Sequence, residues 1–209
     1  MEAYITVAVV AYAIGSINFA VIFSKKFGGF DVRDRGSKNA GTTNVLRTLG
    51  VKAALLTLIC DILKGVVAVS TAIIAKSMWT GFDAVTLKYI AGLMVIIGHT
   101  YPIFYDFRGG KGVATAIGVL LMLNWKIALI CLACGILLIA LSKMVSLGSM
   151  CGAILFPLLS VFMQKGITWL QIVLCFAIGL FVIFNHRTNI KRILAGKENK
   201  LSFKKRVKK

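Results

Sequence analysis

Residues 112–142 read GVATAIGVLLMLNWKIALICLACGILLIALS, an apolar stretch that carries one charge, at Lys126. A helix that crosses a membrane needs about 20 apolar residues. The stretch therefore folds either as one long helix or as two short ones, over 112–123 and 127–142. The choice sets the number of crossings at six or seven, and with it the side of the membrane that each later segment reaches.

The composition of the whole chain places it in a bilayer. Of its 209 residues, 58% are hydrophobic and 15% are charged, and the mean hydropathy is +0.87. A water-soluble domain of this length would leave much of that apolar surface exposed, whereas lipid acts as an apolar solvent for it. We therefore expect an all-α integral membrane protein with one membrane-embedded domain over 1–209. Its other predicted spans are 4–24, 53–75, 87–107, 144–163 and 168–184.

The distribution of the 25 lysines and arginines favours seven spans. With seven spans and the N-terminus outside, twenty of these cations lie on the cytoplasmic side, four lie outside, and Lys64 lies within the membrane. This asymmetry follows the positive-inside rule. One merged helix over 112–142 would put the ten cations of 187–209 opposite those between Lys25 and Lys52. We predict seven transmembrane helices, two of them short, with a cytoplasmic C-terminus and a basic tail over 197–209.

This topology brings three polar segments to the same side of the membrane. They are 33–47, 98–112 and 186–198, and each meets the cytoplasmic interface. Residues that are far apart in the sequence are therefore expected to form one site.

The first polar segment contains GSKNAGTTN, residues 36–44, followed by Arg47. Small and hydroxyl residues leave backbone N–H groups exposed, and such a turn before a helix can hold a phosphate. The same residue types also favour a plain helix cap and loop, and the pattern is not that of a nucleotide-binding Walker A loop. The candidate binding residues are Ser37, Asn39, Gly41, Thr42, Thr43, Asn44 and Arg47.

The second segment reads GHTYP at 98–102 and FRGGKG at 107–112. Gly109 and Gly110 can let the backbone approach a ligand, and Lys111 adds a compact positive charge at that point. Glycines and a lysine also end helices between two spans. A single histidine such as His99 is more often a hydrogen-bonded interface residue than a catalyst.

The third segment begins HRTN at residue 186 and continues to Arg192 and Glu198. His186 and Asn189 are three residues apart, so they share one face of a helix. Because this is where the last helix leaves the membrane, simple anchoring at the interface is the alternative interpretation.

Two charged residues lie inside the second predicted span. Asp61 is about 15 Å into the bilayer at helical rise, and Lys64 follows three residues later. Charges at that depth are unfavourable unless they are paired or face a polar cavity. We expect the two to neutralise each other and to support the site.

The motifs that the sequence lacks exclude several classes of enzyme mechanism. The chain has two histidines and no His-x-x-x-x-Asp pair, H-E-x-x-H motif or G-x-S-x-G elbow. Its five cysteines lie in apolar stretches, and the C-x-x-C of Cys131 and Cys134 has no second pair or nearby histidine, so we predict no metal and no cofactor. Cations and hydrogen-bond donors dominate, which suits phosphate binding and the stabilisation of developing negative charge.

The three segments resemble, in order, the three motifs of the bacterial acyl-phosphate:glycerol-3-phosphate acyltransferase family (the PlsY family). The matching stretches run from Gly36 to Arg47, from Gly98 to Thr115 and from His186 to Glu198, and Asp61-x-x-Lys64-Gly65 matches a further family feature. The second stretch is the most specific. Asn185 stands where the family usually has arginine, so no charge role carries over to that position.

The resemblance implies transfer of an acyl group from acyl phosphate to the 1-hydroxyl of glycerol 3-phosphate. The products are lysophosphatidate and phosphate, in an early step of phospholipid biosynthesis at the bacterial cytoplasmic membrane. Both substrates carry phosphate, and the donor's own phosphate can accept the hydroxyl proton. The partners expected are the two substrates and the bilayer, with no obligate protein partner.

The implied roles fall into three groups. The catalytic group is Ser37, Arg47, Lys111, His186 and Asn189. The phosphate- and substrate-binding group is Asn39, Gly41, Thr42, Thr43, Asn44, His99, Gly109, Gly110 and Arg192. The structural support is Asp61, Lys64 and Glu198.

The alternative function is a membrane transporter of phosphate or an organophosphate. A transporter would also use cations and a glycine-rich loop, but internal repeat symmetry is typical of such proteins and the sequence shows no repeat. A scaffold whose basic tail grips anionic lipid would leave the three motifs unexplained. Nucleic-acid binding by the tail is not expected, because no known nucleic-acid-binding fold accompanies it.

Overall fold

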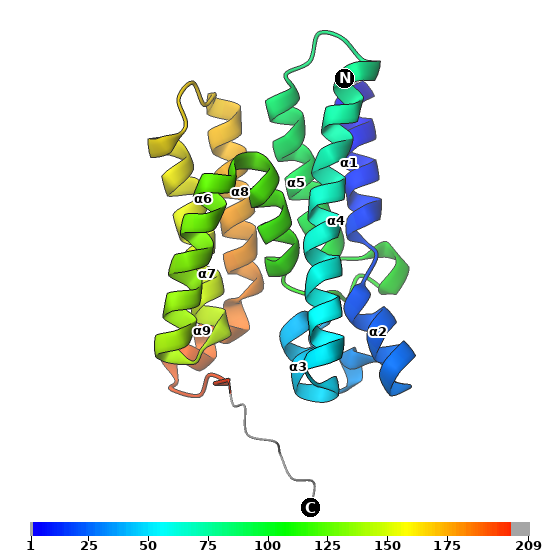
Figure 1. The fold of residues 1–209 in the computed structure, drawn as a ribbon, viewed down its shortest axis with the longest axis vertical. Helices are drawn as coiled ribbons and strands as arrows, with labels where there is room; N and C mark the ends of the chain where they lie inside the picture. The colour runs from blue at the N-terminus through cyan, green and yellow to red at the C-terminus, as the bar shows by residue number, and fades with distance from the viewer. Residues whose placement is uncertain (1, 202–209) are drawn as a thin grey trace, which may run out of the picture.

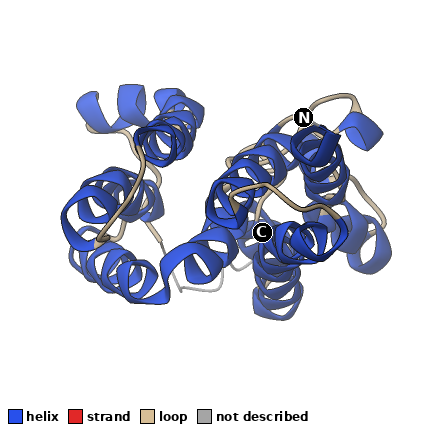
Figure 2. Cartoon of the chain, turned by 90° about the horizontal axis from the view of Figure 1, so that it is seen from above, coloured by secondary structure: helices blue, strands red, loops and turns tan. Residues whose placement is uncertain are grey.

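The computed structural model describes residues 2–201, and every regular element in that range is a helix (Figures 1 and 2). In chain order, the α-helices are α1 (Glu2–Gly15), α2 (Phe19–Gly28), α3 (Thr42–Leu49), α4 (Val51–Met78), α5 (Ala84–Thr100), α6 (Val113–Ser142), α7 (Val145–Met163), α8 (Trp169–Asn185) and α9 (Arg187–Leu194). Two 3₁₀ turns, Val32–Asp34 and Ile103–Tyr105, lie in the connections. Most of the predicted basic tail, residues 202–209, lies outside the described residues.

Five helical segments of the described chain are long and apolar enough to cross a membrane, and the bent pair of α8 and α9 makes a possible sixth. The first of the five combines α1 and α2, and α6 counts as one. Over residues 2–201 the protein is therefore all-helical, with several membrane-spanning segments.

Helix α6 is broken near its middle. Asn124 has φ −158° and ψ 99°, which is extended rather than helical backbone. Val113 and Ile139 line the same cavity, although a straight helix would hold them about 39 Å apart. Figure 1 shows the chain rising, arching over and descending again. The break falls between the two predicted short segments, 112–123 and 127–142.

The first predicted span, 4–24, is also interrupted. Helix α1 ends at Gly15, and α2 begins after Asn18, whose side chain accepts a hydrogen bond from the Val21 N–H at 3.1 Å. Lys64 Nζ donates to the carbonyl oxygens of Gly15 at 3.0 Å and Ile17 at 2.7 Å. These are carbonyls that the break leaves without helical partners. The single helix expected over 4–24 is therefore two helices, and a side chain of α4 stabilises the gap.

The helix of the third predicted span ends earlier than expected, although the apolar segment continues to Tyr105. Helix α5 stops at Thr100, whereas the sequence suggested 107. Tyr101 precedes Pro102, and a proline disfavours the helical conformation of the residue before it. Asp106 and Phe107 then take left-handed backbone angles, so the chain turns back as a loop toward α6.

Close helix contacts rely on glycine. A Cβ on Gly118 of α6 would collide with the carbonyl oxygen of Ile62 in α4, and one on Gly15 of α1 would collide with that of Val95 in α5. Small residues allow this approach of helix backbones in membranes. The two halves of α6 pack against different helices. The first half contacts α4 through Gly118, and the second half contacts α7 through Gly135 and Gly148.

We expect Gly118→Ala to destabilise the protein by about 1 to 3 kcal/mol, because the added methyl group forces two helix backbones apart. The measurement is thermal unfolding of the purified protein in detergent. Gly152→Ala is the matched control, since its added Cβ would lie 3.7 Å from its nearest neighbour, the Cys131 carbonyl oxygen. Equal losses in the two variants would contradict the close contact at Gly118.

The arrangement collects the polar segments at one end of the molecule. Figure 1 shows α3 and α9 together at the end opposite the start of α1. The loop between α5 and α6 reaches toward the same region, because Gly110 lies against Ala40 of the segment before α3.

Candidate active site

A cavity of about 490 Å³ lies where the three polar segments meet, and we call it the polar pocket. All five residues of the predicted catalytic group line it: Ser37, Arg47, Lys111, His186 and Asn189. So do these predicted binding and supporting residues: Asn39, Gly41, Thr42, Thr43, Asn44, Asp61, His99, Arg192 and Glu198. Gly109, Gly110 and Lys64 do not line it.

Lys111 links the second and third segments. It sits in the loop just before α6, and its Nζ donates a hydrogen bond to Asn189 Oδ1. Burial, followed by the charges of Arg192 and Arg47, lowers the pKa of Lys111 to about 8. The ammonium group is therefore a desolvated cation held at a defined point of the pocket wall.

Glu198 organises the third segment. Its Oε1 accepts hydrogen bonds from Asn189 Nδ2 at 2.7 Å and Ser146 Oγ at 2.9 Å, and its Oε2 accepts from Arg192 Nε at 2.8 Å. Burial opposes ionisation, but these hydrogen bonds and the Arg192 charge hold the pKa of Glu198 below its usual value. One carboxylate thus fixes the start of α7 and two side chains of α9 around the pocket.

His186 is oriented by its own helix. It lies at the junction of α8 and α9, with Nδ1 2.8 Å from the Val182 carbonyl oxygen. Because a carbonyl can only accept, Nδ1 carries the proton in this contact. In the neutral imidazole, Nε2 then has a lone pair available to accept a hydrogen bond.

The first segment presents a helix N-terminus to the pocket. Gly41, Thr42 and Thr43 line the pocket at the start of α3, and Gly41 provides no side-chain cap. Within the described chain, the buried Thr42 Oγ1 has no hydrogen-bond partner. Uncapped N–H groups, a free hydroxyl and the positive end of the helix dipole together suit an anion.

Asn44 supports this segment from behind. Its Oδ1 accepts from the Ser37 N–H at 2.9 Å, and its Nδ2 donates to the carbonyl oxygens of Val32 and Arg35, both at 3.0 Å. Both amide hydrogens are used within the protein. The predicted ligand residue Asn44 therefore shapes the loop that carries Ser37.

The glycine pair lies behind the pocket wall. The N–H groups of Gly109 and Gly110 donate to the carbonyl oxygens of Thr100 and His99, at 3.0 and 3.1 Å. A Cβ on Gly110 would collide with the His99 ring and would lie 2.7 Å from the Ala40 carbonyl oxygen. In the structure the two glycines allow tight packing beside Lys111, and the sequence alone did not distinguish this role from contact with a ligand.

A buried charged cluster closes the deep side of the pocket. Asp61 Oδ1 is 3.1 Å from Lys64 Nζ and 3.5 Å from His99 Nδ1, and the three residues are 1%, 4% and 3% exposed. The predicted pairing of Asp61 with Lys64 is formed. Lys64 points away toward the break between α1 and α2, whereas Asp61 and His99 face the pocket.

Several polar residues of the pocket lining were not among the residues predicted from the sequence. Lys38 and Thr188 lie inside the quoted motifs and Asn199 directly follows one, so position along the chain was an available signal. Ser146 and Ser149 stand in an apolar run at the start of α7, where no local pattern marks them. The missed polar lining residues are Lys38, Ser146, Ser149, Thr188 and Asn199.

Comparison with known proteins agrees with this geometry. The model of the family described as glycerol-3-phosphate acyltransferase matches residues 5–196. The glycerol-3-phosphate acyltransferase of Clostridioides difficile is 44% identical over 202 residues, covering 97% of each chain. That of a Thermoanaerobacter species is 45% identical, covering 96% of this chain and 97% of its own.

Solved structures agree as well. The crystal structure of PlsY (YgiH), an integral membrane glycerol 3-phosphate acyltransferase, in its glycerol 3-phosphate form superimposes with a TM-score of 0.83 at 34% identity, covering 95% of this chain and 96% of its own. Its lysophosphatidic acid form gives a TM-score of 0.80 at 33% identity, covering 95% of both. The resemblance found in the sequence is confirmed, and the chain belongs to the glycerol-3-phosphate acyltransferase family.

Proposed function

We propose that this protein transfers an acyl group from acyl phosphate to the 1-hydroxyl of glycerol 3-phosphate. Family membership supports the acyltransferase activity, and the bound forms of the related PlsY support this acceptor and a lysophosphatidate product. The observation that carries the proposal is the polar pocket, where four cations from three segments converge: Lys38, Arg47, Lys111 and Arg192. Two phosphate-bearing substrates need such a concentration of positive charge.

The donor that we propose reacts without a nucleophile from the protein. Acyl phosphate is a mixed anhydride with an activated carbonyl and a phosphate leaving group, so no covalent enzyme intermediate is needed. The acceptor oxygen bonds to the carbonyl carbon, the bond to the phosphate oxygen breaks, and inorganic phosphate leaves. The hydroxyl proton passes to the donor's own phosphate, so no side chain of the protein has to act as a base.

The side chains divide between the two substrates. The N-terminus of α3, with Ser37 and Thr42, holds the donor phosphate. Lys111 and Arg47 hold glycerol 3-phosphate and offset the negative charge that develops on the carbonyl oxygen. His186 Nε2 accepts a hydrogen bond from the acceptor hydroxyl and orients it toward the carbonyl.

The activity test uses purified protein in detergent with acyl phosphate and labelled glycerol 3-phosphate. We expect labelled lysophosphatidate and an equal amount of inorganic phosphate. The same protein in sealed vesicles is then offered labelled glycerol 3-phosphate alone. Uptake into the vesicles with no acylated product in either experiment would favour the transporter, and product from acyl-CoA but not from acyl phosphate would overturn the proposed donor.

We also propose seven crossings with the N-terminus outside and the polar pocket facing the cytoplasm of a bacterial inner membrane. The break at Asn124 and the charge asymmetry of the sequence support this topology. In a variant without the native cysteines, exposed Arg35→Cys and Lys197→Cys should react with an impermeant thiol reagent from the cytoplasmic side. Lys165→Cys, in the connection between α7 and α8, should react only from outside. Labelling of residues 35 and 197 from opposite sides would refute the topology.

The pKa of Lys111 predicts a loss of activity in alkali. The group is positively charged below its pKa of about 8 and neutral above it, so kcat/KM for glycerol 3-phosphate should fall as the pH rises through about 8, approaching tenfold per pH unit. Lys111→Arg should move this fall to higher pH, because a guanidinium group stays charged. The measurement is the pH dependence of kcat/KM for both proteins. If the fall at high pH occurs at the same pH in Lys111→Arg as in wild type, a group other than Lys111 causes it.

A further inference from the structure

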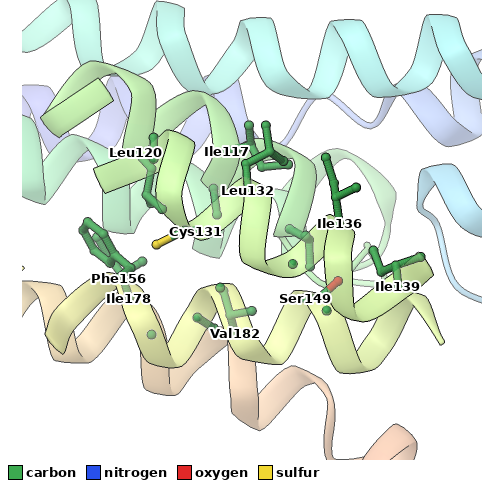
Figure 3. A pocket seen from close by; sticks show the side chains of 18 residues that line it. Ile117, Leu120, Cys131, Leu132, Ile136, Ile139, Ser149, Phe156, Ile178 and Val182 are labelled. Atoms are coloured by element: carbon green, nitrogen blue, oxygen red, sulfur yellow. The ribbon is translucent and has the colours of Figure 1, made fainter. Parts of the chain in front are cut away.

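A second cavity, of about 120 Å³, adjoins the polar pocket, and we call it the apolar groove. It lies between the two halves of α6, α7 and α8, and its lining is almost entirely aliphatic, with Phe156 as its aromatic residue (Figure 3). Four residues line both cavities: Val113, Ile117, Ile139 and Ser149. The groove is therefore a continuation of the polar pocket into the apolar part of the molecule.

The groove has an open end and a closed end. Figure 3 shows Ser149 and Ile139 at one end and Phe156, Leu120 and Ile178 at the other. Along α7, Ser149 and Phe156 are about 10 Å apart at helical rise. The three residues at the far end are 1%, 8% and 2% exposed, so they are packed within the protein. A chain that enters from the polar pocket therefore meets a wall of buried side chains.

Gly152 lies on the wall between these ends, and helix packing does not explain why it is a glycine. A Cβ on its neighbour Gly148 would collide with the Gly135 carbonyl oxygen, and one on Gly179 would lie 2.5 Å from the Ala153 carbonyl oxygen. A Cβ on Gly152 would lie 3.7 Å from the Cys131 carbonyl oxygen, which is ordinary contact. Alanine is more stable than glycine inside a helix. A side chain at this position would take up space in the groove without pressing against a helix backbone.

We propose that Gly152 and Phe156 set the length of the acyl chain that the enzyme accepts. Gly152 keeps the side of the groove open, and Phe156 closes its end. The occupant is the hydrocarbon chain of the acyl phosphate whose phosphate lies in the polar pocket, so this inference rests on the proposed function. Since lipid is as apolar as the groove, selectivity comes from packing contacts and not from transfer out of water.

The first test fills the groove at Gly152. Wild type, Gly152→Ala and Gly152→Leu are assayed with saturated acyl phosphates that differ by two carbons, under one detergent condition. We expect Gly152→Leu to lower kcat/KM for the longest donors by about tenfold and to shift the preferred donor shorter by about four carbons, the number its side chain adds. Gly152→Ala should shift it less and should melt no lower than wild type. Ala140→Leu, a small-to-large change on the exposed face of α6 outside the groove, should leave the chain-length profile unchanged.

The second test opens the closed end. We expect Phe156→Leu to shift the preferred donor to longer acyl chains. Phe156→Ala, where it remains folded, should give a larger shift in the same direction. A Gly152→Leu protein that loses activity equally with every chain length, or keeps the wild-type profile, would overturn the inference. Failure of the wild type to acylate glycerol 3-phosphate with any donor would instead refute the proposed function, so the two failures are distinguishable.

Discussion

Lys111→Ala is expected to lower kcat/KM for glycerol 3-phosphate by about a thousandfold while the protein remains folded. Removal of one preorganised donor from the place where negative charge develops lowers rates by about a hundred- to a thousandfold. Lys111 is also desolvated, which strengthens its interaction with an anion. The substitution additionally removes the hydrogen bond that holds Asn189 toward the pocket. The measurement is steady-state kinetics with both substrates varied, beside thermal unfolding of the same preparation.

The control for this prediction is a lysine that takes no part in the pocket. Lys165 is exposed in the connection between α7 and α8, and Lys165→Ala should leave both rate and stability as in wild type. Lys111→Arg keeps the charge but not the compact ammonium, and we expect it to retain an intermediate activity. A folded Lys111→Ala protein that turns over at close to the wild-type rate would remove the charge-stabilisation scheme.

The convergence of the three polar segments could be predicted because it depends on quantities that are local in the sequence. Apolar length gives the candidate spans, and the count of cations on each side selects among the ways to connect them. The five predicted catalytic residues then line one pocket although Ser37 and Asn189 are far apart in the chain. The chemistry of the pocket follows from residue types, since lysine, arginine, hydroxyl and amide groups can serve few purposes at a membrane interface other than anion binding or anchoring.

Roles that depend on tertiary partners could not be predicted. Asn44 belongs to a phosphate-binding pattern, yet its amide is occupied by the backbone of Val32, Arg35 and Ser37. The gap between α1 and α2 follows an apolar run with no proline, and it is stabilised by Lys64 from another helix. The periodicity of hydrophobic residues along the sequence carries no information about either set of hydrogen bonds.

Glycine illustrates the same limit. The G-x-x-x-G pair of Gly148 and Gly152 indicates helix packing, and Gly148 does pack closely against Gly135. Gly152 has room for a side chain and lines the apolar groove. The two positions of one motif are therefore glycine for different physical reasons. Only the positions of the neighbouring helices distinguish these reasons.

Lys64→Met is expected to lower the free energy of unfolding by about 3 to 5 kcal/mol, because it leaves the Asp61 carboxylate buried without its closest cation. The lost ammonium also donates to the Gly15 and Ile17 carbonyl oxygens, so the break between α1 and α2 loses its stabilising contact. The measurement is denaturant-induced unfolding in detergent micelles, with Lys76→Met, an exposed lysine near the end of the same helix, as the control.

A double-mutant cycle separates the two contributions of Lys64. Asp61→Asn together with Lys64→Met removes both charges, and it should be more stable than the sum of the single substitutions predicts, since no uncompensated ion remains. It should still be less stable than wild type, because the carbonyls of the α1–α2 break stay without a donor and buried polar groups need one. Full recovery in the double variant would show that Lys64 acts on Asp61 alone, and a Lys64→Met protein as stable as wild type would show that the pair is not buried as the structure describes.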